Sequence, residues 1–190
     1  PTAQLIFLRG VMATLLVLAI ARGLGATRRI GDALRRPVLT RAAVDALATV
    51  LYLASLFNLP IANATAINLA SPLFIAVLAV RFLQEQVGWR RWAAIGAGCF
   101  GVLLVIQPRA EGFNVFALVC LAATVCHAVR DLLTRRIPAG IPSILITLTT
   151  AVAVTLLAGA LSLVEGWRPF GLFEFALLAM ASVFLAGGYY

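Results

Sequence analysis

The chain has 190 residues, of which 63% are hydrophobic and 12% charged, and its mean hydropathy is +1.04. Soluble domains are about half apolar and about a quarter charged, so this composition excludes an ordinary soluble domain and favours a lipid bilayer as the solvent. The net charge is +8 and every basic residue is arginine. Because these arginines are divided among several connectors rather than gathered on one face, they do not indicate nucleic-acid binding.

Seven long apolar stretches are predicted to be membrane-spanning helices, and nearly all charges lie between them. In lipid every backbone N–H and C=O must be satisfied within its own segment, so apolar stretches of ~17–25 residues form helices. The fold class is therefore all-α, a polytopic transmembrane bundle. In chain order the predicted spans are Ala3–Leu24, Ala42–Leu59, Ala62–Arg81, Trp92–Ile106, Asn114–Val129, Ile141–Val164 and Phe173–Tyr190.

The arginines alternate between the connectors. Twelve lie in or beside residues 25–41, 81–91 and 130–140, whereas the other connectors contain only Arg109 and Arg168. Because positively charged loops remain in the cytoplasm, the Arg-rich connectors are predicted to be cytoplasmic.

The first two spans carry polar groups where lipid makes them costly. Arg9 lies several residues inside the first span, where it is either functional or, as we favour, structural through snorkelling or bonds to carbonyls. In the second span a polar stripe at helical spacing should face inward and line a cavity. Tyr52 offers a solute both a stacking surface and a hydroxyl. For the hydroxyls of Thr49 and Ser55, hydrogen bonding between helices is favoured over contact with a solute. The stripe consists of Asp45, Thr49, Tyr52 and Ser55; Asp45 could instead pair with a nearby arginine such as Arg41.

The third span contains Asn68, Ser71 and Pro72 near its middle. Proline has no N–H, so the carbonyl of Asn68 loses its helical partner and the helix should kink. Such a kink could present polar groups to a substrate or could be a packing feature, and the sequence leaves both open. After this span, Glu85 is predicted to pair with a neighbouring arginine and anchor the turn.

His127, the only histidine, lies in the fifth span. An imidazole titrates near neutral pH, so His127 could bind substrate or relay protons, although a hydrogen-bonded packing role is the more common one. Gly96 to Gly101 match a dinucleotide-binding pattern, but they lie within a helix and follow no strand, so we reject nucleotide binding. The sequence contains no nucleophile elbow or metal-ligand cluster, so no cofactor or metal is expected and an enzyme is not favoured.

A weak internal repeat is visible. Pro1-Thr2-Ala3 resembles Pro142-Ser143-Ile144, and Ala46–Val50 resembles Ala181–Leu185. A unit with an odd number of helices enters the membrane in the opposite sense when it is repeated, which is the inverted arrangement common in transporters. The chain starts with Pro1 and ends inside an apolar run, so we expect it to be a piece of a longer protein.

Several motifs together resemble the EamA-like domain of the drug/metabolite transporter superfamily. The run from Leu69 to Leu78, which includes Ser71-Pro72-Leu73-Phe74, is followed by Glu85 and by the glycine-rich Gly96–Gly101, as in that family. Phe7-Leu8-Arg9 and Thr134-Arg135-Arg136 also match. The stretches Ala66–Leu73 and Leu185–Tyr190 look closest to the riboflavin-type and S-adenosylmethionine-type members.

The resemblance implies a carrier in the bacterial inner membrane that works by alternating access. It would have ten helices in two inverted repeats of five, of which residues 1–111 would hold most of the first and residues 112–190 part of the second. Cavity contacts are predicted for Tyr52, Asn68, Ser71, Pro72, Tyr189 and His127. The solute would be a small polar or amphipathic metabolite, and proton coupling is a possibility that the histidine raises.

Two other functions remain as alternatives. A membrane-embedded enzyme that acts on a lipid-linked substrate would need several acids or histidines near one interface, and the sequence has few. A non-catalytic interaction subunit would not need the inward polar stripe of the second span.

Overall fold

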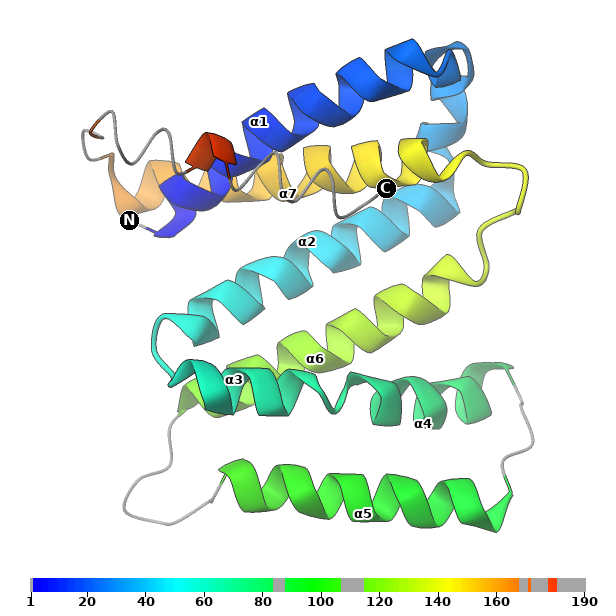
Figure 1. The fold of residues 1–190 in the computed structure, drawn as a ribbon, viewed down its shortest axis with the longest axis vertical. Coiled ribbons are helices and arrows are strands. Elements are labelled where there is room, and N and C mark those ends of the chain that lie inside the picture. Colours follow the sequence, from blue (N-terminus) through cyan, green and yellow to red (C-terminus); the bar gives the residue numbers. More distant parts are fainter. Residues whose placement is uncertain (1, 84–87, 107–114, 168–170, 172–177, 181–190) are drawn as a thin grey trace. The chain divides into compact units, whose positions relative to one another are not determined.

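The computed structural model describes residues 2–83, 88–106, 115–167, 171 and 178–180. These residues form helices and contain no β-strand, which confirms the all-α prediction. In chain order the helices are α1 (Thr2–Gly23), the 3-10 helix η1 (Ala26–Leu34), α2 (Arg36–Leu56), α3 (Ile61–Asn68), α4 (Ser71–Leu83), α5 (Trp89–Ile106), α6 (Val115–Thr134) and α7 (Ser143–Glu165) (Figure 1).

Of the helical segments that the structure describes, five are long and apolar enough to cross a membrane, and each overlaps a predicted span. They are Ala3–Gly23, Arg36–Leu56, Ile61–Phe82, Val115–Thr134 and Ser143–Val164. The fourth predicted span is also helical, as α5. Of the seventh, Phe173–Tyr190, the structure describes only the helical residues Leu178–Met180, so the rest of that prediction lies outside the described residues.

Several helices extend further than the sequence predicted, α2 and α6 the most. Helix α2 begins at Arg36 rather than Ala42, and α6 continues to Thr134 rather than Val129. The prediction ended each span where charged residues begin, but a helix keeps its backbone hydrogen bonds in the polar headgroup region as well. The expected connector 25–41 is likewise partly helical, because it contains η1.

The chain forms two compact units. The first unit comprises residues 1–46 and 136–190, and the second comprises residues 47–135. In the first unit α1 and α7 lie side by side and run in opposite directions (Figure 1). The boundary predicted between residues 111 and 112 separates the two expected repeats, not these compact units, and it stays a prediction. The buried core of the first unit consists of Val17, Ala21, Ala33, Ile144, Leu145 and Leu148.

Glycines allow α1 and α7 to approach closely. A Cβ atom on Gly10 would lie 3.3 Å from Cβ of Thr155 and 3.4 Å from its Cα, and it would also overlap the hydroxyl oxygen. A Cβ atom on Gly159 would lie 3.0 Å from the ring of Phe7. Helices in lipid associate through such small residues because contact between backbones replaces contact with lipid.

In the second unit α6 packs against α3 and α4, and α4 packs against α5. A Cβ atom on Gly98 of α5 would lie 2.5 Å from a methyl group of Leu73 in α4, so α4 and α5 approach closely at this glycine. Gly96 and Gly101 have open space instead. The buried core of the second unit consists of Leu59, Ala64, Ile67, Ala117 and Cys120.

Candidate substrate site

The third predicted span is interrupted where the proline predicts it. Helix α3 ends at Asn68 and α4 begins at Ser71. At the junction the N–H of Leu69 donates to the Thr65 carbonyl at 2.9 Å, and that of Ala70 donates to the Ile67 carbonyl at 3.0 Å. Pro72 has no N–H to offer the Asn68 carbonyl. The break therefore makes Asn68 the last residue of a helix rather than a position inside one.

Three of the predicted cavity residues meet at this break. Oδ1 of Asn68 lies 3.1 Å from Nδ1 of His127 on α6, within hydrogen-bonding distance. The ring of Tyr52 on α2 is tilted by 57° against the His127 ring, with 6.1 Å between the ring centroids. All three side chains are half-buried. The sequence predicted these residues on three separate spans, and the structure brings them together.

Nearby polar side chains bond to backbone carbonyls. The Ser55 hydroxyl donates to the carbonyl of Tyr52 at 2.7 Å, and the Thr124 hydroxyl donates to that of Cys120 at 2.9 Å. The Cys120 thiol lies 3.5 Å from the carbonyl of Ala64, which joins α6 to α3. Ser55, Thr124 and Cys120 are fully buried; these bonds of Ser55 and Thr124 stay within their own helices, and of the three contacts described only that of Cys120 joins two helices.

The remaining predicted site residues have different surroundings. Ser71 is half-buried and Pro72 exposed at the beginning of α4, and their contact with a substrate stays a prediction. Arg9 is half-buried in α1 and has an interaction partner there, so it is not a free charge. Glu85 and Tyr189 lie outside the described residues.

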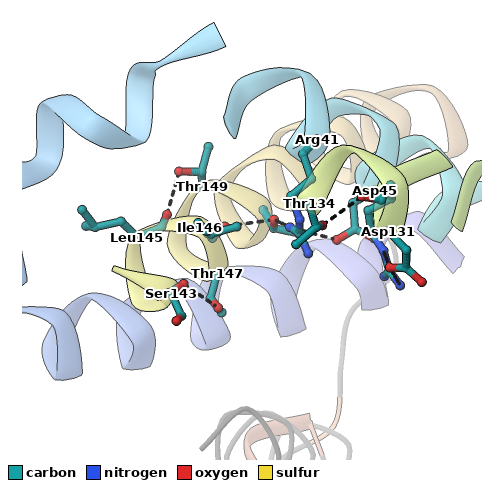
Figure 2. Close-up of polar contacts among 11 residues, drawn as sticks. Arg41, Asp45, Asp131, Thr134, Ser143, Leu145, Ile146, Thr147 and Thr149 are labelled. Carbon is teal, nitrogen blue, oxygen red and sulfur yellow. Dashed lines mark hydrogen bonds and ion pairs between the residues drawn. The ribbon is translucent and has the colours of Figure 1, made fainter. Parts of the chain in front are cut away.

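A second polar cluster lies in the first unit. Nη1 of Arg41 is 3.5 Å from Oδ2 of Asp45, and both side chains are largely buried (Figure 2). Arg41 also donates to the hydroxyl of Thr150 on α7. The expected pairing of Asp45 with Arg41 is confirmed, whereas Thr150 was missed. The sequence does not distinguish Thr150 from the other threonines of α7. Two of these, Thr147 and Thr149, donate to the carbonyls of Ser143 and Leu145 within their own helix (Figure 2).

The comparison with protein families shows to which family the chain belongs. The EamA-like transporter family matches residues 1–107, more than half of the chain. The chain belongs to the EamA-like transporter family. The EamA match includes α1 to α5 and therefore both Tyr52 and Asn68.

Curated EamA relatives are named as transporters. The S-adenosylmethionine uptake transporter of Rickettsia bellii is 32% identical over 119 residues, which are 63% of this chain and 40% of that protein. The riboflavin transporter of Rhizobium johnstonii is 34% identical over 158 residues, 80% of this chain and 52% of that protein. The pseudopaline exporter CntI of Pseudomonas aeruginosa is 28% identical over 194 residues, 98% of this chain and 66% of that protein.

The chain thus spans about half the length, or less, of the first relatives that it matches. No solved structure matches it significantly. The relatives bear out the resemblance seen in the sequence, including its riboflavin-type and S-adenosylmethionine-type members.

Proposed function

We propose that the chain is part of a secondary transporter that moves a small polar or amphipathic metabolite across the bacterial inner membrane by alternating access. Membership in the EamA family and five apolar helices of membrane-spanning length support this function. The observation that carries it is the meeting of Tyr52, Asn68 and His127 from three such segments, because polar groups gathered within lipid indicate a pathway for a solute.

The same proposal includes ten helices in two inverted repeats, with the first repeat ending near residue 111. The sequence offset between Pro1-Thr2 and Pro142-Ser143 supports it, because α1 begins at Thr2 and α7 begins at Ser143. Thr14 and Thr155, which are 141 residues apart, also face each other with 3.4 Å between their hydroxyl oxygens. The Arg-rich connectors would face the cytoplasm, as the positive-inside rule requires.

The substrate would contact Tyr52, Asn68 and His127, with Ser71, Pro72 and Tyr189 as further contacts. A tyrosine ring stacks on a planar group, and amide and imidazole groups fix a polar edge. Riboflavin and S-adenosylmethionine, named for the relatives, both contain a flat nitrogen heterocycle, so a metabolite of that kind is the first candidate.

Transport by the full-length protein in cells or vesicles tests this proposal. We expect Tyr52→Ala and Asn68→Ala each to lower the initial rate about tenfold, since losing about 1.4 kcal/mol of binding corresponds to a factor of ten. Radiolabelled riboflavin and S-adenosylmethionine are the first substrates to measure.

Asn63→Ala is the matched control, because Asn63 lies in the same helix as Asn68 and its side chain is exposed. It should keep the wild-type rate at equal expression. Normal transport by both Tyr52→Ala and Asn68→Ala would remove the assignment of the site, and failure to transport any metabolite would remove the function.

A further inference from the structure

The contact between Asn68 and His127 determines which ring nitrogen carries the hydrogen. Oδ1 of Asn68 is an amide oxygen and can only accept, and it lies 3.1 Å from Nδ1 of His127. A neutral imidazole has one N–H and one bare nitrogen. With this orientation of the amide, the hydrogen belongs on Nδ1, where it donates to Asn68, and Nε2 carries the lone pair.

The break between α3 and α4 holds Asn68 in position. Two turn hydrogen bonds, from Leu69 to Thr65 and from Ala70 to Ile67, end α3 immediately after Asn68. On the other side, Cys120 ties α6 to the Ala64 carbonyl of α3, two turns or less from the Asn68–His127 contact on each helix. These contacts place the backbone of Asn68 relative to α6, so that its amide can reach the imidazole.

We propose that Asn68 is a positioning residue that holds His127 as the Nδ1–H tautomer, so that Nε2 is the atom that takes and releases a coupling proton. This rests on the proposed transport function. In the loading step Nε2 binds a proton from water on one side of the membrane, and the ring becomes an imidazolium with both nitrogens protonated. In the release step Nε2 gives that proton to the other side, and the Nδ1–H bond to Asn68 is unchanged throughout.

Few other titratable groups lie on the described segments packed around His127. One turn further along α6, Arg130 and Asp131 form an ion pair of 2.7 Å. The packed segments add few titratable groups: Tyr52 from α2, none from α3, and Arg81, exposed, from α4. Cys120 and Cys126 are the others on α6. Among these described groups His127 is the one that ordinarily titrates near neutral pH.

Nitrogen NMR of the full-length protein, labelled with ¹⁵N-histidine, tests the tautomer directly. The His127 signals are assigned as those that disappear in His127→Gln. At a pH where the ring is neutral, we expect a one-bond coupling to hydrogen at Nδ1 and none at Nε2. Hydrogen on Nε2 in the wild-type protein would overturn the proposal, and this outcome needs no other variant.

Variants of Asn68 test the positioning role. Asn68→Asp keeps an acceptor oxygen and should keep the hydrogen on Nδ1, whereas Asn68→Leu should lose this preference and give a mixture of both tautomers. Asn63→Leu, the same change at an exposed position of α3, should leave the wild-type spectrum. An unchanged spectrum in Asn68→Leu would show that another group sets the tautomer.

Proton flux tests the coupling separately. In vesicles that contain a pH-sensitive dye, wild-type substrate transport should move protons with it, and His127→Gln should lose that proton movement. Proton movement at the wild-type ratio in His127→Gln would exclude His127 as the carrier. A protein that transports no substrate but has the Nδ1–H tautomer would remove the proposed function and leave the positioning role of Asn68.

Discussion

Among the glycines that the structure describes, Gly10 leaves the least room for an added side-chain atom. Its added Cβ would overlap the Thr155 hydroxyl and press against the backbone of α7. We expect Gly10→Val to destabilise the protein by about 1–3 kcal/mol, as overpacking of a close interface does. The measurement is the thermal midpoint of the detergent-solubilised protein, which should fall by several degrees.

Gly23→Val provides the matched control, because Gly23 belongs to the same helix and nothing lies within 4 Å of its added Cβ. Its thermal midpoint should stay close to the wild-type value. Equal midpoints for the two variants would mean that α1 and α7 do not approach each other at Gly10.

The sequence predicted the residues of the cluster better than their contacts. Tyr52 and Asn68 could be predicted because a polar group inside an apolar span is costly and must face something other than lipid, and His127 because an imidazole titrates near neutral pH. Their meeting depends on how α6 is rotated against α3. That rotation is set by small buried residues such as Ala64, Ala117 and Cys120, and alanine-rich helices offer many equivalent stripes of this kind.

At the scale of elements, the break between α3 and α4 is the feature with the clearest consequence. Pro72→Ala supplies an N–H for the carbonyl of Asn68, so α3 and α4 can join into one helix. The side chain of Asn68 should then turn away from His127 and lose a hydrogen bond worth about 1 kcal/mol, which corresponds to about a fivefold slower transport. Transport rate and thermal midpoint are measured together, and the midpoint should not fall.

Pro60→Ala is the comparison, because Pro60 precedes α3 and its carbonyl, unchanged by the substitution, accepts from Asn63 and Ala64. It should transport normally. If Pro72→Ala also transports normally with its stability intact, the helix break is a packing feature, the alternative that the sequence left open.

Hydropathy predicts where the helices lie, and each difference between that prediction and the structure has a physical cause. Five predicted spans recur as long apolar helices because lipid leaves the backbone no other partner. Helices α2 and α6 were predicted too short because charged residues mark the edge of the hydrocarbon layer and not the end of a helix. The break after Asn68 could be predicted from one residue, Pro72, because proline has no backbone N–H in any conformation.

At the scale of the molecule, the contact between Thr14 and Thr155 bears on the inverted repeat. Their separation of 141 residues equals the offset between the prolines that precede α1 and α7, so in the proposed repeats each threonine would face its own equivalent. In a symmetric assembly only residues at the two-fold axis contact their own copies. We therefore place the pseudo-two-fold axis of the proposed repeats between these two hydroxyls, in the middle of the antiparallel pair.

A disulfide at this point tests both the axis and the mechanism. In a background without native cysteines, Thr14→Cys/Thr155→Cys should cross-link under mild oxidation, measured as loss of thiols that a maleimide mass tag can label. Alternating access exchanges the conformations of the two repeats, and residues on the axis keep their spacing during that exchange. Cross-linked protein should therefore still transport, and reduction should change its rate little. The single-cysteine variants should keep their thiol. Transport that stops on cross-linking and returns on reduction would place the moving interface between Thr14 and Thr155, and the axis elsewhere.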